Sequence, residues 1–218
     1  MEDKMVKDSL IKLVNDILEI HENIEKSWLD YLNKESIKTI NFNSVKVYEI
    51  SQDNETLAYI RRYINFINKQ AALITPCFDY SFLDRTRVKD PLSVKQKLES
   101  YCNKKEKGRI KTHKCLNDLF GFRVVVDDPI DCEMLTKELK EIFPSEIIIT
   151  NSSKLDGYKA VHVYTPAANG HFKWELQIWD RESYDLNISL HESHKRKYIT
   201  DLKEAARAEK GEVRNVHP

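Results

Sequence analysis

Apolar residues recur at helical spacing through residues 6–33 and again through residues 55–74. The second run is followed by Pro76, which cannot continue a helix. Each run therefore predicts an amphipathic helix that packs on the rest of the protein or on a partner chain. The connector between them is polar and leans towards β structure, with a short strand expected at 45–48. The expected inward positions are Leu10, Leu13, Val14, Ile17, His21, Ile24, Trp28 and Leu32 in the first helix, and Leu57, Ile60, Ile64, Ile67 and Ala71 in the second.

From residue 78 onward, runs of β-branched and aromatic residues alternate with amphipathic stretches. The expected strands cover 79–89, 120–126, 146–150, 158–165 and 172–179, with a hairpin through Asn169 and Gly170 before the last. The expected helices begin at Asp90-Pro91 and cover 131–142, 180–199 and 201–209. In the helix at 131–142, the expected inward residues are Cys132, Leu135, Leu139 and Ile142. The pattern predicts an α/β (α+β) fold, a mixed β-sheet of about five strands flanked by helices, with an N-terminal helical extension.

Residues 116–127, Leu-Asn-Asp-Leu-Phe-Gly-Phe-Arg-Val-Val-Val-Asp, contain the most continuous apolar run. Such a run is typical of a central strand covered on both faces. Asp118 and Arg123 interrupt it, and a buried charge is costly unless it is paired or binds a ligand. Taken alone, the segment allows Asp118 to cap the turn and pair with Arg123. The other interpretation is that both side chains serve a binding site.

The strand predicted at 172–179 places Trp174, Leu176 and Ile178 on one face. Glu175 and Gln177 therefore share the opposite face, because side chains alternate along a strand. A Glu and a Gln on one face of a core strand are unusual unless that face lines a cleft.

Composition is that of an ordinary soluble protein of 218 residues, with 41% apolar and 32% charged residues. No apolar run approaches the roughly 20 residues of a membrane helix, and no signal peptide is recognised, so a cytoplasmic protein is expected. The four cysteines have irregular spacing, which argues against a zinc site and favours reduced thiols. The net charge is zero, yet basic residues cluster at Lys104–Lys114 and at His191–Lys197, which ends in Lys195-Arg196-Lys197. Two such clusters beside one site make a polyanionic ligand worth considering.

A phosphate-binding arrangement is predicted around the helix that starts at Asp90-Pro91. Arg87 and Lys89 are two residues apart on a strand and point the same way, and Ser93 and Lys97 share one face of the helix. Cations beside a helix N-terminus suit a phosphate group. Taken alone, this segment favours a surface strand and a solvated helix face over a binding site.

Four motifs occur in order between Arg87 and His191. They are Arg-Val-Lys-x-x-x-Ser-x-x-x-Lys, Asp-Leu-Phe-Gly-x-Arg, Lys-x-x-Gly-Tyr-x-x-x-His and Glu-x-Gln-Ile. Together they resemble the synthetase domain of the RelA/SpoT family, over about half of the chain. The resemblance implies a nucleotidyltransferase-like sheet and transfer of the β,γ-pyrophosphate of ATP to a ribose 3′-hydroxyl. It also implies a division into an N-terminal helical extension (1–77), the pyrophosphokinase domain (78–199) and a C-terminal helix and tail (200–218).

The resemblance assigns roles to individual residues. Asp118 and Glu175 are implied to be catalytic and to hold Mg²⁺, Glu175 by orienting the metal or activating the hydroxyl. The implied ATP-binding residues are Arg87, Lys89, Ser93, Lys97 and Arg123, and the implied acceptor-binding residues are Lys154, Tyr158, His162 and Gln177. Chemistry supports these types independently, since phosphoryl displacement needs Mg²⁺ on hard oxygens, cations along the triphosphate and a base near the attacking hydroxyl.

Departures from the family pattern bear on the acceptor. The family's usual Asn before Gly-Tyr is Asp156 here, and the usual Gln-Ile-Arg-Thr is Gln177-Ile178-Trp179-Asp180. This drift resembles toxin-type small alarmone synthetases, which modify the 3′ end of tRNA and are neutralised by an antitoxin. The expected acceptor is therefore the tRNA 3′-CCA end, with GDP or GTP as the alternative. A catalytically dead nucleotide-sensing module is a further alternative, and homo-oligomer formation is open.

Overall fold

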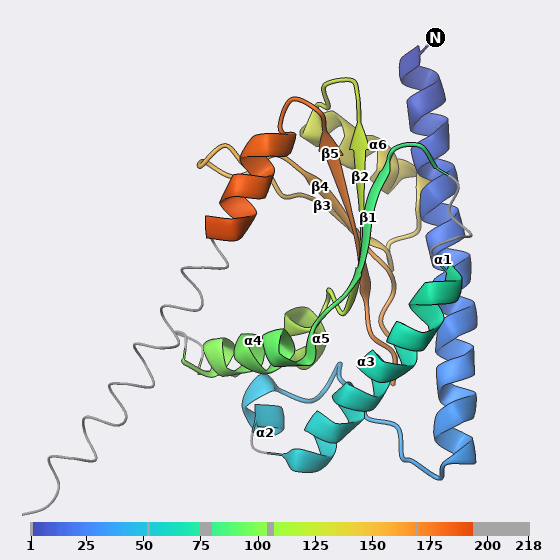
Figure 1. The fold of residues 1–218 in the computed structure, drawn as a ribbon, viewed down its shortest axis with the longest axis vertical. Coiled ribbons are helices and arrows are strands. Elements are labelled where there is room, and N and C mark those ends of the chain that lie inside the picture. The colour runs from blue at the N-terminus through green and yellow to red at the C-terminus, as the bar shows by residue number, and fades with distance from the viewer. Residues whose placement is uncertain (1, 52, 75–79, 104–106, 169, 194–218) are drawn as a thin grey trace, which may run out of the picture.

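The computed structural model describes residues 2–51, 53–74, 80–103, 107–168 and 170–193 (Figure 1). Its centre is one five-stranded mixed sheet in the order β1-β2-β5-β4-β3. The strands are β1 (Leu83–Val88), β2 (Phe120–Val126), β3 (Ile148–Asn151), β4 (Val161–Tyr164) and β5 (Trp174–Asp180). The central strands β2 and β5 run parallel, and every other neighbouring pair is antiparallel. The predicted fold class is confirmed, and so is the central strand over 120–126.

One face of the sheet is covered by α1 (Glu2–Lys34), α3 (Asn54–Ile74) and α6 (Cys132–Ile142), and α1 runs along the length of the sheet (Figure 1). Trp28 on α1 is fully enclosed and packs its ring against Tyr59 and Tyr63 of α3. Tyr63 in turn packs against Phe172 beside β5. These contacts join the N-terminal helices and the sheet in one apolar core.

The opposite face carries a smaller apolar cluster of Val125, Tyr158, Ala160 and Trp179. A helix at 184–193, drawn in orange in Figure 1, covers this cluster. Asn187 fixes the helix, because its side-chain amide accepts from the Lys159 backbone N–H at 3.1 Å and donates to the Lys159 carbonyl at 2.7 Å. On the same side of the sheet, α4 (Pro91–Asn103) lies at the other end (Figure 1). The two helices therefore leave the middle of this face open.

The strand expected at 45–48 is wrong. Val47–Ser51 form a short helix, α2, and Lys46 makes only an isolated bridge to Lys111 beside α5 (Thr112–Cys115). Val47 and Ile50 are both buried, and their three-residue spacing turns them to one side of a helix. The Lys46 backbone N–H also donates to Glu49 Oε2 at 2.8 Å, a capping bond that favours the helix.

Element boundaries differ in smaller ways from the predictions. β1 begins at Leu83 and β4 covers only four residues, both shorter than expected. Ile142 is 46% exposed, because α6 ends there and Phe143 takes the buried place instead. The predictions for Cys77, Lys104, Lys105, Asn169, Lys195–Lys197 and the helix at 201–209 fall outside the described residues.

None of the helices in the described part of the chain combines the length and the apolar character needed to cross a membrane. The three cysteines that the structure describes, Cys102, Cys115 and Cys132, form no disulfide bond.

Candidate active site

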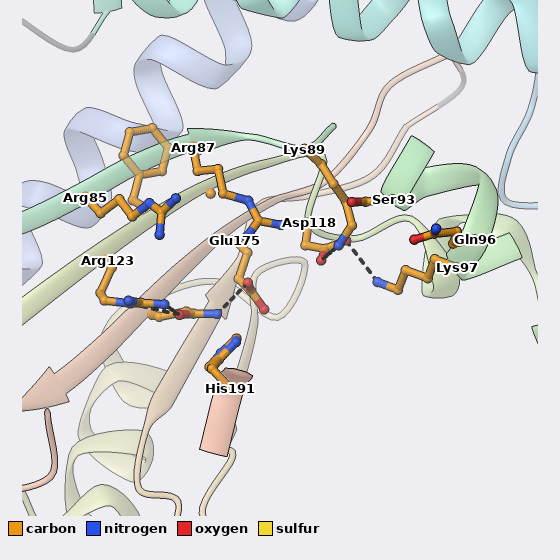
Figure 2. Close-up of a pocket in the computed structure, with 13 residues that line it drawn as sticks. Arg85, Arg87, Lys89, Ser93, Gln96, Lys97, Asp118, Arg123, Glu175 and His191 are labelled. Atoms are coloured by element: carbon orange, nitrogen blue, oxygen red, sulfur yellow. Dashed lines mark hydrogen bonds and ion pairs between the residues drawn. The ribbon is translucent and has the colours of Figure 1, made fainter. Parts of the chain in front are cut away.

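A cavity of about 330 Å³ opens on the face of the sheet between α4 and the helix at 184–193. Figure 2 shows basic side chains from β1 and α4 on one side of it and two carboxylates at its floor. The residues that line it include eight of the predicted site residues, two of them on β5. They are Arg87, Lys89, Ser93, Lys97, Asp118, Arg123, Glu175 and Gln177, together with Arg85, Gln96, Gly121, Phe122 and His191.

The basic wall is built by strand alternation and one helical turn. Arg85 and Arg87 lie two residues apart on β1, and Lys89 follows immediately after it, so all three point into the cavity. Asp90 accepts a hydrogen bond from the Ser93 backbone N–H at 3.0 Å and so caps α4. This cap places Ser93 on the first turn and Lys97 one turn later on the same face. The cluster has the make-up expected of a site for a polyphosphate.

Asp118 forms ion pairs with two lysines. Its Oδ2 accepts from Lys89 and its Oδ1 accepts from Lys97 at 2.9 Å. Burial raises the pKa of Asp118, but the charges of Lys97 and Lys89 outweigh burial and hold the pKa well below its usual range. Burial also lowers the pKa of Lys89. At Lys97, the negative charge of Asp118 outweighs burial, so the pKa of Lys97 is raised. Asp118 is therefore an ionised carboxylate at neutral pH.

Arg123 faces the cavity and does not pair with Asp118. Its guanidinium donates to Gln177 Oε1 at 3.2 and 3.3 Å and stacks on the Trp179 ring at 3.7 Å from the centroid. Asp84 lies 3.9 Å away as its anionic partner. The pairing of Asp118 with Arg123, the simpler interpretation of the central strand, is therefore wrong. Trp179 is one of the two departures from the family pattern in the Gln-Ile-x-x segment, and its ring packs against one face of the Arg123 guanidinium.

Glu175 is held by hydrogen bonds at both carboxylate oxygens. The Tyr164 hydroxyl donates to Oε1 at 2.9 Å, and the Gln177 amide donates to Oε2 at 2.9 Å. His162 Nδ1 lies 3.3 Å from Oε1. Burial raises the pKa of Glu175, but His162 and Tyr164 outweigh it, and the net shift is downward. A carboxylate fixed in this way keeps one orientation towards the cavity.

The donor set suits Mg²⁺, which binds through one or two carboxylates and completes its shell with substrate phosphates and water. Asp118 and Glu175 line one cavity and are close enough for the charge of Asp118 to raise the pKa of Glu175. Among the described residues, no three His, Cys, Asp or Glu side chains gather as a metal cluster. A two-carboxylate site of this kind depends on the substrate for the rest of its ligands.

The predicted acceptor residues are divided between two places. Gln177 lines the cavity, and His162 lies next to it through Glu175. Tyr158 is 4% exposed, and its ring contacts Trp179 and His191 while its hydroxyl bonds His162 Nε2 at 3.1 Å. Lys154 lies on the exposed loop 153–156 with its ammonium 5.4 Å from the Tyr158 ring. Tyr158 is thus covered by the helix at 184–193 in this structure.

Sequence reasoning gave no site role to three polar residues that line the cavity, Arg85, Gln96 and His191. Arg85 has a recognisable signal, because it continues the two-residue spacing of Arg87 and Lys89. Gln96 carries no such signal, and the only signal at His191 is its place in the basic cluster at 191–197. His191 reaches the cavity only because the helix at 184–193 folds back over the sheet (Figure 2).

Comparison with known proteins identifies the family. A family described as "Region found in RelA / SpoT proteins" matches residues 86–202, more than half of the chain. No curated protein sequence matches the chain.

Three similar solved structures come from Bacillus subtilis. Small alarmone synthetase 1 is 20% identical, covers 73% of this chain and 96% of its own, and has a TM-score of 0.31. Small alarmone synthetase 2 is 20% identical, covers 70% of this chain and 89% of its own, and has a TM-score of 0.35. A structure of small alarmone synthetase 1 bound to AMPCPP is 17% identical, with coverages of 73% and 96% and a TM-score of 0.29. The sequence match over 86–202 is what assigns the family: the chain belongs to the RelA/SpoT family, and this region is its RelA/SpoT-type pyrophosphokinase domain.

Proposed function

We propose that this protein transfers the β,γ-pyrophosphate of ATP to a ribose 3′-hydroxyl, and that the acceptor is the 3′-CCA end of tRNA. The observation that carries the reaction is the pairing of Asp118 with both Lys89 and Lys97 in the cavity that Glu175 also lines. Cations and carboxylates at this spacing meet the needs of a phosphoryl-transfer site.

Each group in the cavity has a distinct task in this proposal. Lys89, Lys97 and the first turn of α4 with Ser93 hold the triphosphate, while Arg87 and Arg123 hold the adenine nucleotide. Asp118 and Glu175 would hold Mg²⁺, which supplies charge neutralisation at the phosphates when it is bound.

The transfer itself is a displacement at phosphorus. The ribose 3′-oxygen forms a bond to the β-phosphorus, and the bond from that phosphorus to the α–β bridging oxygen breaks, so AMP leaves. Glu175 accepts the proton of the attacking hydroxyl, which requires the carboxylate to be ionised beforehand. The downward shift of its pKa is consistent with this role.

The acceptor assignment rests on the basic segment that precedes β2. Lys107, Arg109, Lys111 and Lys114 follow one another closely there, and such a run can bind the phosphates of an acceptor stem. Lys154, Tyr158, His162 and Gln177 remain the predicted contacts of the terminal nucleotide. A toxin role, with an antitoxin protein as partner, belongs to this proposal.

GDP or GTP is the second candidate acceptor. It is favoured by the zero net charge of the chain and by the cavity of about 330 Å³, which is the size of a small-molecule site. Both candidates share the same reaction and differ only in the hydroxyl that attacks.

One assay separates these candidates. The protein is incubated with γ-labelled ATP and Mg²⁺, and with GDP, GTP, deacylated tRNA or tRNA lacking its 3′-terminal adenosine. Label in intact tRNA alone is the expected result. Label in GDP or GTP and none in tRNA would overturn the tRNA acceptor, and label in no acceptor would leave a nucleotide-sensing module instead of an enzyme.

A further inference from the structure

The helix at 184–193 covers a side chain that the proposed reaction needs. Tyr158 is a predicted contact of the terminal nucleotide, and an aromatic ring binds a base by stacking. Yet Tyr158 is only 4% exposed, its ring lies 5.9 Å from that of His191, and its hydroxyl bonds to His162 Nε2 at 3.1 Å. His191 also lines the cavity, so it stands where the cavity adjoins Tyr158 (Figure 2). A base in the cavity therefore cannot stack on Tyr158 while the helix keeps this place.

The end of β5 is built to hold this helix. Trp179 contacts the rings of Tyr184 and His191, at 6.1 and 5.9 Å between centroids. Asp180 is 3% exposed, and its Oδ1 accepts from the Ser183 backbone N–H at 2.7 Å, a bond that fixes the turn before the helix. Trp179 and Asp180 are the two departures from the Gln-Ile-Arg-Thr pattern of the family. Both substituted side chains thus contact the helix or the turn that leads into it.

The helix forms a single layer that is separate from the main core. Asn187 is fully buried and joins the helix to Lys159 through the two hydrogen bonds described above. Ile188 and Leu190 pack on the smaller apolar cluster, whereas Ser189 on the outer side is exposed. That cluster is distinct from the core formed with α1, α3 and α6. The helix can therefore move away without disturbing the main core, as is typical of elements with low local stability.

We propose that the helix at 184–193 is a lid on the acceptor site, and that it must open before the acceptor base can stack on Tyr158. This inference rests on the proposed function, because it takes Tyr158 as an acceptor contact. A ligand that binds only the open form loses apparent affinity in proportion to the population of that form. The lid weakens the binding of every acceptor by the same factor. An acceptor with further contacts elsewhere on the protein, such as a tRNA acceptor stem, can still bind where a mononucleotide cannot.

The lid is tested with variants that weaken its closed position. Asn187→Ala removes both hydrogen bonds to Lys159, an exposed residue whose backbone groups water can reach once the lid opens. Leu190→Ala, at a half-buried residue of the same helix, is the second variant and serves if Asn187→Ala does not fold. Ser189→Ala, at an exposed residue between these two sites, is the matched control.

Binding is measured by fluorescence anisotropy without ATP, with a deacylated acceptor-stem minihelix ending in CCA and, separately, with labelled GDP. The minihelix should bind about tenfold more tightly to Asn187→Ala than to the wild type, because two hydrogen bonds that favour the closed form are lost. Any binding of GDP should improve by the same factor, since the cost of opening is common to both probes. Ser189→Ala should bind both probes like the wild type.

Opening of the lid can also be followed without an acceptor. The three tryptophans of the chain are fully buried, and Trp179 alone among them belongs to the cluster beneath the helix. Acrylamide should therefore quench tryptophan fluorescence more strongly in Asn187→Ala and Leu190→Ala than in the wild type and Ser189→Ala.

The two measurements together decide the proposal. Stronger quenching with unchanged minihelix affinity would show that the helix opens but covers no acceptor contact, and would overturn the lid. Unchanged quenching and affinity in both variants would overturn it as well, and weaker binding would make the helix a part of the acceptor site instead. Tighter binding by a protein that labels no acceptor would retain the lid and reject the proposed transfer.

Discussion

Asp118 is the residue whose ion pairs bear most directly on the proposed reaction. Its two oxygens pair with Lys89 and Lys97, which neutralise a carboxylate that burial alone would leave unstable. In the proposed reaction, the triphosphate of ATP would offer the same lysines a stronger anionic partner. Their transfer to the phosphates would free Asp118 for Mg²⁺, so the ion pairs keep the site in order before substrate binds.

Replacing Asp118 by Asn should reduce kcat by at least about a hundredfold, because it removes one of two proposed metal ligands and leaves the lysines without their partner. Steady-state labelling assays measure the effect. Asp128→Asn, at an exposed carboxylate outside the cavity, should behave like the wild type. Near-normal turnover in Asp118→Asn would remove this residue from the catalytic site.

Gln177 connects Arg123 to Glu175, since it accepts from the first and donates to the second. Replacement by Leu should lower kcat about tenfold, the effect of leaving a carboxylate oxygen without one of its donors. The matched control is Gln96→Leu, at another glutamine that lines the cavity. If both variants lost activity equally, the loss would reflect the shape of the cavity and not the hydrogen bonds of Gln177.

For single residues, the sequence predicts which side chains line the cavity better than it predicts what each side chain contacts. The spacing of Arg87, Lys89 and Lys97 placed them in one cavity correctly, because strand and helix periodicities fix which side chains share a face. It could not say that Arg123 stacks on Trp179, since that contact depends on how two strands distant in the sequence are paired.

Among the elements, α1 contributes more than apolar surface. Glu25 lies inside the core, where its Oε1 accepts from the Tyr63 hydroxyl and the Trp174 indole donates to that hydroxyl at 3.0 Å. Its other oxygen, Oε2, has no hydrogen-bond partner among the residues that the structure describes. Burial raises the pKa of Glu25 to about 8, although Tyr63 opposes the shift. The carboxyl group is therefore mostly protonated at neutral pH.

The free energy of unfolding should fall between pH 6.5 and pH 8. Folded Glu25 binds its proton more tightly than the unfolded chain, whose pKa is near 4.5, so its contribution is complete below that value and is lost as pH rises to about 8. Burial lowers the pKa of His21 to about 4, so that residue acts only below pH 6.5. Urea unfolding should show a decrease of about 1 to 2 kcal/mol across the window.

Glu25→Gln should abolish this pH dependence. Glu22→Gln, at an exposed glutamate on the same helix, should leave it unchanged. A wild-type slope that persists in Glu25→Gln would assign the proton to another group.

Long elements were predictable, and short ones were not. The helices over 2–34 and 54–74 have enough apolar repeats for their period to be clear. α2 has five residues, and its Val-Tyr-Glu-Ile sequence fits a strand equally well until the burial of Val47 and Ile50 decides. The helix at 184–193 was expected, but its position over Tyr158 depends on the bonds between Asn187 and Lys159, which no local pattern indicates.

For the molecule as a whole, the shared core implies that the N-terminal helices and the sheet unfold together. Trp28→Ala should lower the free energy of unfolding by about 3 to 5 kcal/mol, because it removes a fully buried indole. The two tryptophans that remain, Trp174 and Trp179, both lie in β5, and Trp179 packs on the face of the sheet opposite to α1 and α3, so fluorescence then reports on the surroundings of this strand.

Far-UV circular dichroism of the same variant reports mainly on the helices. The two transitions should coincide. Leu92→Ala, at a residue that is 62% exposed, is the control and should change stability little. Two separate transitions would instead show that α1 and α3 fold as an independent unit.

The parallel pair at the centre of the sheet has a consequence for protein synthesis. Arg123 and Gln177, which pair across β2 and β5, are 54 residues apart in the chain. A ribosome adding residues from the N-terminus releases β2 well before its central neighbour exists, and contacts between distant segments form late. Asp118 and Glu175 therefore cannot meet in a nascent chain until β5 has emerged, so a growing polypeptide carries the whole basic wall before the two carboxylates of the cavity are brought together.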